Sequence, residues 1–256
     1  MDAVDWCALL TVALAAGWLD AVVGGGGLVQ VPALMVLLPT APVATLLGTN
    51  KLVAITGTSS AAVTYARRVG LDAPHAFRAG LIGVPTSLLG ALTAAWLPQR
   101  VFVPVVLVSL LGAAAVGVWS VRGGAGGTGG DGPRFRWPTR WTLTAAGLIG
   151  YYSGAVGSGT GVLLVALFTA ALGTGFLQGS ATAKAVSIGT DLGALALFAS
   201  LGHVLWATGA AMALANITGG AIGARTAIRR GAGFVRAALL CTVAALVTKL
   251  AIDHWA

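Results

Sequence analysis

The 256-residue sequence has few charged side chains with which to make a surface that water can solvate. Lys, Arg, Asp and Glu make up 9% of the residues, and hydrophobic residues make up 57%. A soluble domain carries roughly 25% charged residues, because a compact chain must cover itself with polar groups. The composition therefore excludes a single soluble enzyme domain and favours a protein whose solvent is the lipid bilayer.

Cysteines and enzyme motifs are also scarce. Cys7 and Cys241 lie in apolar stretches without CxxC spacing or a neighbouring histidine, so we expect buried free thiols and no metal site. The segment around Ser158 cannot form a nucleophile elbow, because Val156 stands where that motif needs glycine. No nucleotide-binding motif is present. We therefore expect a protein that is not an enzyme, with no catalytic residue and no cofactor.

Ten apolar runs fill most of the chain, and many have the roughly 17 to 25 residues of a transmembrane helix. They cover residues 6–22, 28–38, 43–66, 77–97 and 101–121, and then 141–156, 162–172, 179–201, 206–226 and 234–252. The Gly- and Arg-rich segment between these two sets cannot be buried in lipid. The sequence predicts an all-α polytopic membrane protein with about eight spanning segments, organised as a first transmembrane repeat (6–121), a cytoplasmic linker (122–140) and a second transmembrane repeat (141–253).

The second half of the chain repeats the first at a constant shift. Gly157 follows Gly24 by 133 residues, and Thr182 follows Thr49 by the same 133. A glycine cluster (24–27 and 157–160) and a Thr-x-Lys triplet therefore recur in one register. We interpret this pattern as an internal duplication in which each repeat opens with a glycine-broken helical hairpin.

The basic residues favour an inverted arrangement of the repeats. If each glycine-interrupted run enters the membrane and returns, only Arg100 and Lys249 lie opposite a group of eleven arginines, which is the bias expected of cytoplasmic residues. If each run crosses once, the arginines are divided between both faces. The hairpin arrangement places the N- and C-termini outside, the linker in the cytoplasm and the repeats in opposite orientations, as in secondary transporters. The eleven are Arg67, Arg68, Arg78, Arg122, Arg134, Arg136, Arg140, Arg225, Arg229, Arg230 and Arg236.

The glycine clusters are candidates for an anion site. A turn at membrane depth must be buried in protein or line a polar cavity. Half-helices that begin at such a turn direct their backbone N–H groups and positive dipole ends into it. The alternative is that the glycines only permit close packing of helices.

Four charged residues are expected within the membrane. Lys51 and Lys184 occupy equivalent positions in the two repeats, Asp20 precedes the first glycine cluster, and Asp191 lies two turns after Lys184 on the same helix face. The acids are candidates for proton coupling or substrate binding. Alternatively, acids and bases only compensate one another's charge. Weaker candidates either line a path or bond between helices: Gln30, Asn50, Ser153, Ser158, Thr160 and Asn216.

At these residues the sequence resembles the TauE/SafE sulfite-exporter family, also called the toluene-sulfonate uptake permease family. The resemblance implies a multi-pass inner-membrane carrier that moves small sulfur-containing anions, such as sulfite, thiosulfate or organosulfonates. Thr160 and Ala183 depart from the family pattern, so the half-sites are expected to contribute unequally. Carried over residue by residue, the resemblance places substrate contacts at Gly25, Gly26, Thr49, Asn50, Lys51, Gly157, Ser158, Gly159, Thr182 and Lys184.

The expected partners are a small anionic substrate and the lipid bilayer, with no nucleic acid. A homo-oligomer is compatible with the sequence. A passive anion channel and a non-transporting membrane subunit are the alternative functions.

Overall fold

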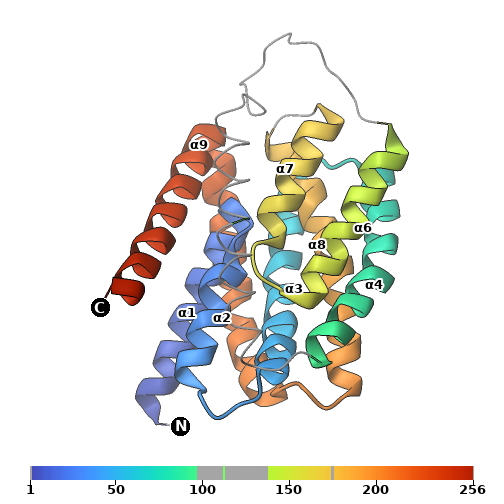
Figure 1. The fold of residues 1–256 in the computed structure, drawn as a ribbon. Coiled ribbons are helices and arrows are strands. Elements are labelled where there is room, and N and C mark those ends of the chain that lie inside the picture. Colours follow the sequence, from blue (N-terminus) through green and yellow to red (C-terminus); the bar gives the residue numbers. More distant parts are fainter. Residues whose placement is uncertain (1, 97–111, 113–137, 174–175, 256) are drawn as a thin grey trace.

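The computed structural model describes residues 2–96, 112, 138–173 and 176–255. Within these ranges the chain forms helices and no strands (Figure 1), which confirms the predicted all-α class. The predicted span 101–121 and most of the predicted linker lie outside the described residues. The first half contains α1 (Ala3–Val23), α2 (Gly26–Leu37), α3 (Val43–Arg68) and α4 (Ala73–Trp96), and the second contains α6 (Thr139–Ala155), α7 (Thr160–Leu172), α8 (Phe176–Ser200) and α9 (Trp206–Trp255).

The helices differ in whether they are long enough to cross a bilayer. At 1.5 Å per residue, α3 and α8 are about 39 and 38 Å long, longer than the roughly 30 Å hydrocarbon core of a membrane. In contrast, α2 and α7 have 12 and 13 residues and are too short to cross it. Among the described residues, α1 and α4 combine spanning length with a strongly apolar composition. The helices α3 and α8 are less apolar because they carry buried polar and charged groups.

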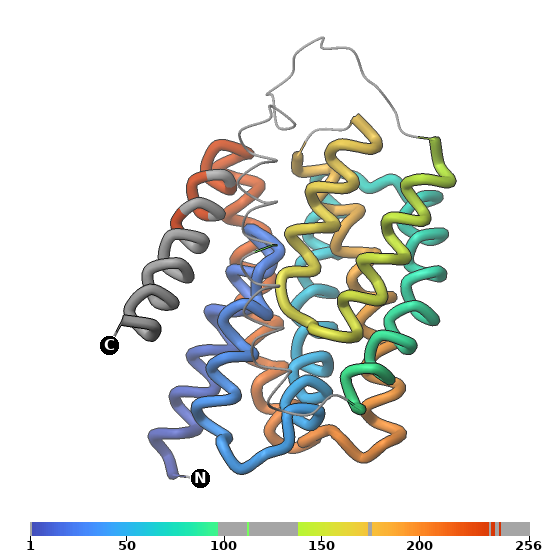
Figure 2. The backbone as a smooth tube through the Cα atoms, viewed as in Figure 1, coloured from blue at the N-terminus to red at the C-terminus, as the bar shows by residue number. Residues whose placement is uncertain are grey.

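Each half opens with a helical hairpin broken at its glycines. Gly24 ends α1 with a φ of +86°, and Gly157 and Gly159 precede α7 with φ of +76° and +77°. Glycine reaches this left-handed region without the steric penalty of a Cβ. In Figure 1, α1 rises from the lower end of the bundle and α6 descends from the upper end, so the two hairpins enter from opposite ends. The backbone trace in Figure 2 follows the same two paths.

The helices α4 and α9 each pack on helices of the other half of the chain. The helix α4 contacts α6 and α8, α9 contacts α1 and α3, and α3 meets α8 at the centre. Glycines allow close approach at these contacts. A Cβ on Gly223 of α9 would lie 2.5 Å from the carbonyl oxygen of Trp18, and a Cβ on Gly90 of α4 would lie even closer to the carbonyl oxygen of Tyr151. Gly90 and Gly223 are 133 residues apart, as are Trp18 and Tyr151.

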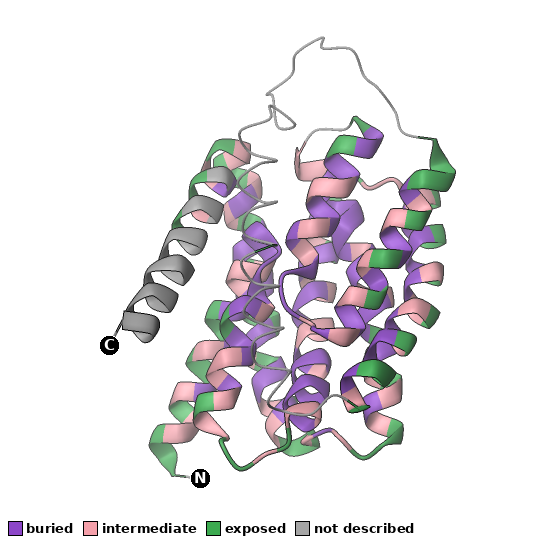
Figure 3. Cartoon of the chain, viewed as in Figure 1, coloured by how far each residue is buried: buried purple, intermediate pink, exposed green. Residues whose placement is uncertain are grey.

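Many large apolar side chains are exposed on the outer surface of the bundle, and Figure 3 shows exposed positions on the outward faces of the helices. Cys7 and Cys241 are exposed there, so the expectation that they are buried was wrong. Leu10 and Leu14 are exposed on the same face of α1 as Cys7. The apolar neighbours of Cys7 therefore face the surroundings of the protein, not its core. The end of the chain also differs from a single helix, because α9 is broken at Gly231, in agreement with the two runs predicted there.

Candidate functional site

The two glycine turns lie against each other in the interior. A Cβ on Gly24 would lie 2.5 Å from the carbonyl carbon of Gly161, and a Cβ on Gly27 would lie 3.0 Å from the carbonyl oxygen of Gly157. Since α2 begins at Gly26 and α7 at Thr160, both short helices start at this contact. The runs predicted from the sequence, 28–38 and 162–172, begin two residues after these helix starts.

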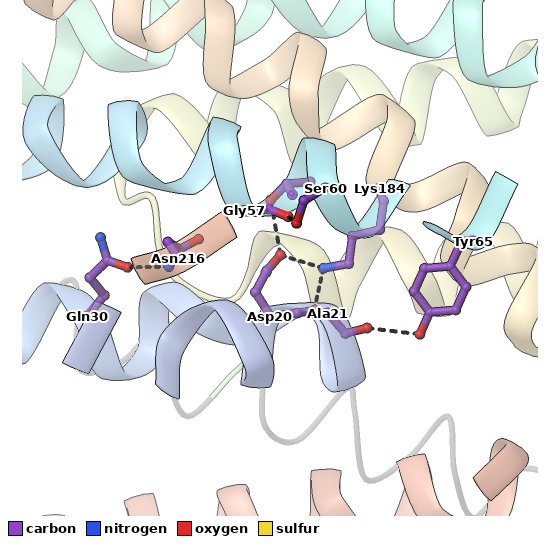
Figure 4. Close-up of polar contacts among 9 residues, drawn as sticks. Asp20, Ala21, Gln30, Gly57, Ser60, Tyr65, Lys184 and Asn216 are labelled. Carbon is purple, nitrogen blue, oxygen red and sulfur yellow. Dashed lines mark hydrogen bonds and ion pairs between the residues drawn. The ribbon is translucent and has the colours of Figure 1, made fainter. Parts of the chain in front are cut away.

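Two ion pairs join the halves of the chain beside the turns. Lys51 of α3 donates to Asp191 Oδ1 of α8 at 2.6 Å and to Ser153 Oγ of α6 at 2.9 Å. Lys184 of α8 donates to Asp20 Oδ2 of α1 at 2.6 Å and also to the Asp20 carbonyl, as Figure 4 shows. The two lysines are only 2% and 1% exposed. Each half therefore supplies one buried lysine and one aspartate, and each lysine pairs with the aspartate of the other half. Asp191 is buried, whereas Asp20 is half-buried and not, as the sequence suggested, fully enclosed.

The two ion-pair clusters use equivalent positions. Under the 133-residue shift, Asp20 corresponds to Ser153, and Thr58 corresponds to Asp191. In the Lys184 cluster the acid is Asp20, and Thr58 donates to its carboxylate at 3.0 Å. In the Lys51 cluster the acid and the hydroxyl have exchanged positions, because the acid is Asp191 and Ser153 supplies the hydroxyl. Each cluster thus contains one ammonium, one carboxylate and one hydroxyl group.

A cavity of about 30 Å³ lies between the turns and the ion pairs. It is lined by both glycine turns, by Asp20 and Asp191, and by Asn50, Thr160 and Ser187. Within the described part of the chain, Asn50 Oδ1, Thr160 Oγ1 and Ser187 Oγ are buried without a hydrogen-bond partner. An unsatisfied buried polar group costs about 1–3 kcal/mol. The three atoms therefore mark a place suited to a polar occupant, although the cavity as it stands admits only water-sized molecules.

The sequence of this chain matches the family model described as "Sulfite exporter TauE/SafE" over residues 9–250. The chain belongs to this family. The resemblance drawn from the glycine and Thr-x-Lys motifs is thereby confirmed, and membership of a membrane transporter family establishes a membrane location.

Other members of the TauE/SafE family cover nearly the same length. "Probable membrane transporter protein ORF9" of Sinorhizobium sp is 34% identical over 96% of this chain and 92% of its own. "Probable membrane transporter protein YfcA" of Escherichia coli (strain K12) is 29% identical over 96% of this chain and 92% of its own. A "Probable membrane transporter protein" of Haemophilus influenzae is 28% identical over 96% and 94%, respectively. No solved structure shows a significant match to the chain.

In this TauE/SafE member, the residues predicted to contact substrate divide into two groups. Asn50, Gly157 and Gly159 line the cavity, and the two lysines lie in the ion pairs beside it. The others are engaged elsewhere. Gly25 is the N-cap of α2, Gly26 lies against Ala16 and Asp20, and Ser158 donates to the Gly27 carbonyl.

The two threonines bond to other parts of the bundle. Thr49 donates to the Thr45 carbonyl and accepts a hydrogen bond from Leu205 N. Thr182 donates to the Gln178 carbonyl and accepts a hydrogen bond from Asp72 N.

Two polar cavity-lining residues were not singled out from the sequence. Ser187 lies one turn after Lys184 and one turn before Asp191 on α8. Thr58 lies seven residues after Lys51 on α3. Both positions share a helix face with a buried lysine, since residues three, four and seven apart align along a helix. That spacing was the signal available for finding them.

Several other polar side chains hold helices together. Asn216 of α9 donates to the Ala13 carbonyl at 2.7 Å and to Gln30 Oε1 at 3.3 Å, and Tyr65 donates to the Ala21 carbonyl at 2.9 Å. Figure 4 shows the Asn216–Gln30 and Tyr65–Ala21 contacts on either side of the Asp20–Lys184 pair. In the ranges that the structure describes, no three His, Cys, Asp or Glu side chains are grouped so as to hold a metal ion.

Proposed function

We propose that this protein is a secondary transporter that moves a small sulfur-containing anion, such as sulfite, thiosulfate or an organosulfonate, across the inner membrane. Family membership supports transport in general. The observation that carries the proposal is the buried cavity where two glycine turns, two lysine–aspartate pairs and three unpartnered polar side chains converge.

The chemistry around the cavity suits an oxyanion. Two helix N-termini supply backbone N–H groups and partial positive charge, and Lys51 and Lys184 supply full charges. Asn50, Thr160 and Ser187 offer additional hydrogen bonds from the cavity wall. We therefore assign substrate contact to these three residues, the two lysines and the backbone of the two turns, with the other predicted contacts supporting the turns.

The ion pairs suggest how anion and proton movements are coupled. Each ammonium is already neutralised by a carboxylate, so a bound anion must compete with Asp20 or Asp191. Protonation of one carboxylate would release its lysine, and the anion would then neutralise the ammonium. Entry of one proton with one negative charge keeps the buried site neutral, which low-dielectric surroundings strongly favour. We therefore propose that the anion moves together with a proton.

Alternating access follows from an inverted repeat. We propose that the α1–α2 and α6–α7 hairpins, each with its glycine turn, separate in alternation towards opposite sides of the membrane. Support comes from contacts that recur under the 133-residue shift, such as Gly223 with Trp18 and Gly90 with Tyr151. A cavity of about 30 Å³ must widen before sulfite can enter, which argues for a carrier and against an open channel.

The proposal is tested by uptake of labelled sulfite into proteoliposomes containing the purified protein. We expect saturable uptake that thiosulfate and a simple organosulfonate inhibit, and that chloride does not. Replacing Asn50 and Ser187 with Ala should raise the apparent KM at least about tenfold, because each loses a hydrogen bond to a charged group. Thr218→Ala, whose exposed hydroxyl bonds only within α9, is the matched control.

Four outcomes would contradict the proposal in different ways. Uptake that rises linearly without saturation would indicate a channel. Wild-type KM in the Asn50→Ala, Ser187→Ala variant would exclude the cavity as the binding site. An absence of uptake for every sulfur oxyanion would exclude these anions as the substrate. Uptake that does not respond to an imposed pH gradient would exclude proton coupling while leaving the rest of the proposal intact.

A further inference from the structure

Four exposed arginines line a second, larger cavity at the surface of the bundle. This cavity, the arginine groove, has a volume of about 490 Å³ and lies where the last turns of α3 meet α9. Its walls are Arg67 and Arg68 of α3 and Arg225 and Arg229 of α9, together with Val63, Thr64 and Ile228. The groove shares no lining residue with the central cavity.

Among the described side chains, none balances the positive charge of the groove. No acidic side chain lines it, and no ion pair between described side chains includes one of these four arginines. The whole sequence has seven acidic residues against 15 basic ones, and Asp20 and Asp191 are already paired with lysines. Four guanidinium groups held in one groove repel one another unless an anion lies between them. The groove therefore has the electrostatics of an anion-binding site.

The surroundings of the groove are apolar on the side that leads into the membrane. Val63 lies one turn before Arg67 on α3 and is 48% exposed, and Ile222 lies about one turn before Arg225 on α9 and is 49% exposed. A ligand that fills the whole surface needs a negatively charged head for the arginines and a hydrocarbon part for these side chains. A free inorganic anion would use only the first of these features.

We propose that the arginine groove binds an anionic phospholipid through its phosphate headgroup. The planar guanidinium fork pairs two N–H groups with two phosphate oxygens, and basic pockets between transmembrane helices suit anionic headgroups. The acyl chains would lie along Val63 and Ile222. Because α3 and α9 come from different halves of the chain, the lipid would bridge the two halves at this end of the bundle.

The test compares lipid binding to the full chain with that of two double variants. Native mass spectrometry in detergent would measure how well each protein retains phosphatidylglycerol and phosphatidylcholine. The groove variant carries Arg67→Gln together with Arg225→Gln, and the control variant carries Arg78→Gln together with Arg140→Gln; both are compared with the wild type. Arg78 and Arg140 are exposed arginines of α4 and α6 outside the groove, so the second variant has the same net charge as the first. We expect the wild type and the control to prefer phosphatidylglycerol, and the groove variant to bind it roughly 30-fold less tightly.

Two further arms separate the alternatives. The Arg67→Lys, Arg225→Lys variant keeps the charge while losing bidentate geometry, and should bind phosphatidylglycerol with intermediate affinity even if the glutamine variant folds poorly. Inorganic phosphate at millimolar concentration should not displace the lipid. Equal losses in the groove and control variants, equal retention of both lipids by the wild type, or displacement by free phosphate would each overturn the proposal.

Discussion

At the residue scale, the lysine–aspartate pairs have the largest energetic consequences. The Lys51 ammonium is 2% exposed and has Asp191 and Ser153 as its partners. Burying an ion pair gains little net stability, but removing one member leaves an uncompensated buried charge and costs about 3–5 kcal/mol. Replacing one member of the pair should therefore reduce the stability of the protein more than replacing both members together.

This difference gives a double-variant prediction. Lys51→Met should destabilise the protein by about 3–5 kcal/mol, because Asp191 loses its partner. Adding Asp191→Asn should recover most of this loss, since no charge remains buried there. Thermal unfolding in detergent would measure both variants, and sulfite uptake should stay abolished in the double variant. Full uptake by a stable double variant would mean that this pair has only a structural role.

The glycine turns also depend on single residues. Gly24 has a φ of +86°, and a Cβ there would lie 2.5 Å from the carbonyl carbon of Gly161. Gly70 has a φ of +79° but has open space around it. Replacing either glycine would therefore strain the backbone, but only a side chain at position 24 would also clash with a neighbouring segment.

Substituting alanine at each position separates the two effects. Gly70→Ala should cost about 1–2 kcal/mol from the left-handed backbone alone. Gly24→Ala should cost a further roughly 1–3 kcal/mol, because it forces the two glycine turns apart. Unfolding midpoints in the same detergent would measure the difference. Equal losses at the two positions would show that the turns do not pack as closely as described.

At the scale of the helices, the sequence predicted the existence and approximate ends of most elements. The runs 43–66 and 206–226 begin at the same residues as α3 and α9, because apolar length is the dominant signal for helices in a bilayer. The exposure of Cys7 on the outer surface could not be predicted in the same way. In a membrane protein, lipid-facing and core-facing side chains are both apolar, so composition does not distinguish them.

The two clusters around the lysines allow an exchange of equivalent residues between helices. Ser153→Asp combined with Asp191→Thr would give the Lys51 cluster the acid and hydroxyl positions that the Lys184 cluster has in the native chain. Asp191→Thr alone should cost about 3–5 kcal/mol, and Ser153→Asp should restore at least half of that loss by returning a carboxylate to Lys51. The comparison is made by thermal unfolding. If Ser153→Asp gave no recovery, the clusters would not be structurally equivalent.

At the scale of the whole molecule, the arrangement of the hairpins gives a topology that can be measured. The α2–α3 loop and the α3–α4 loop lie at opposite ends of the bundle in Figure 1. The arginine bias predicts that the end with the α3–α4 loop faces the cytoplasm. Thr40 and Ala73 are exposed at these two ends, so each can carry a reporter.

In a Cys7→Ser, Cys241→Ser background, Thr40→Cys should react with a membrane-impermeant maleimide in intact cells. Ala73→Cys should react only after the membrane is opened. The reverse pattern would invert the predicted orientation, and labelling of both positions in intact cells would contradict a membrane-spanning α3.

The sequence by itself showed that the chain belongs in a lipid bilayer, that it is helical, which family it resembles and which charged residues lie within the membrane. These properties follow from composition and from short motifs at fixed spacing. It also placed the glycine turns, since a run of glycines inside an apolar segment has few other structural meanings. The tertiary structure alone decided that Lys51 pairs with Asp191 and Lys184 with Asp20, and that Ser187 and Thr58 line the cavity. These contacts join residues 140 and 164 positions apart, and their geometry depends on how α1, α3, α6 and α8 pack, which local spacing does not encode.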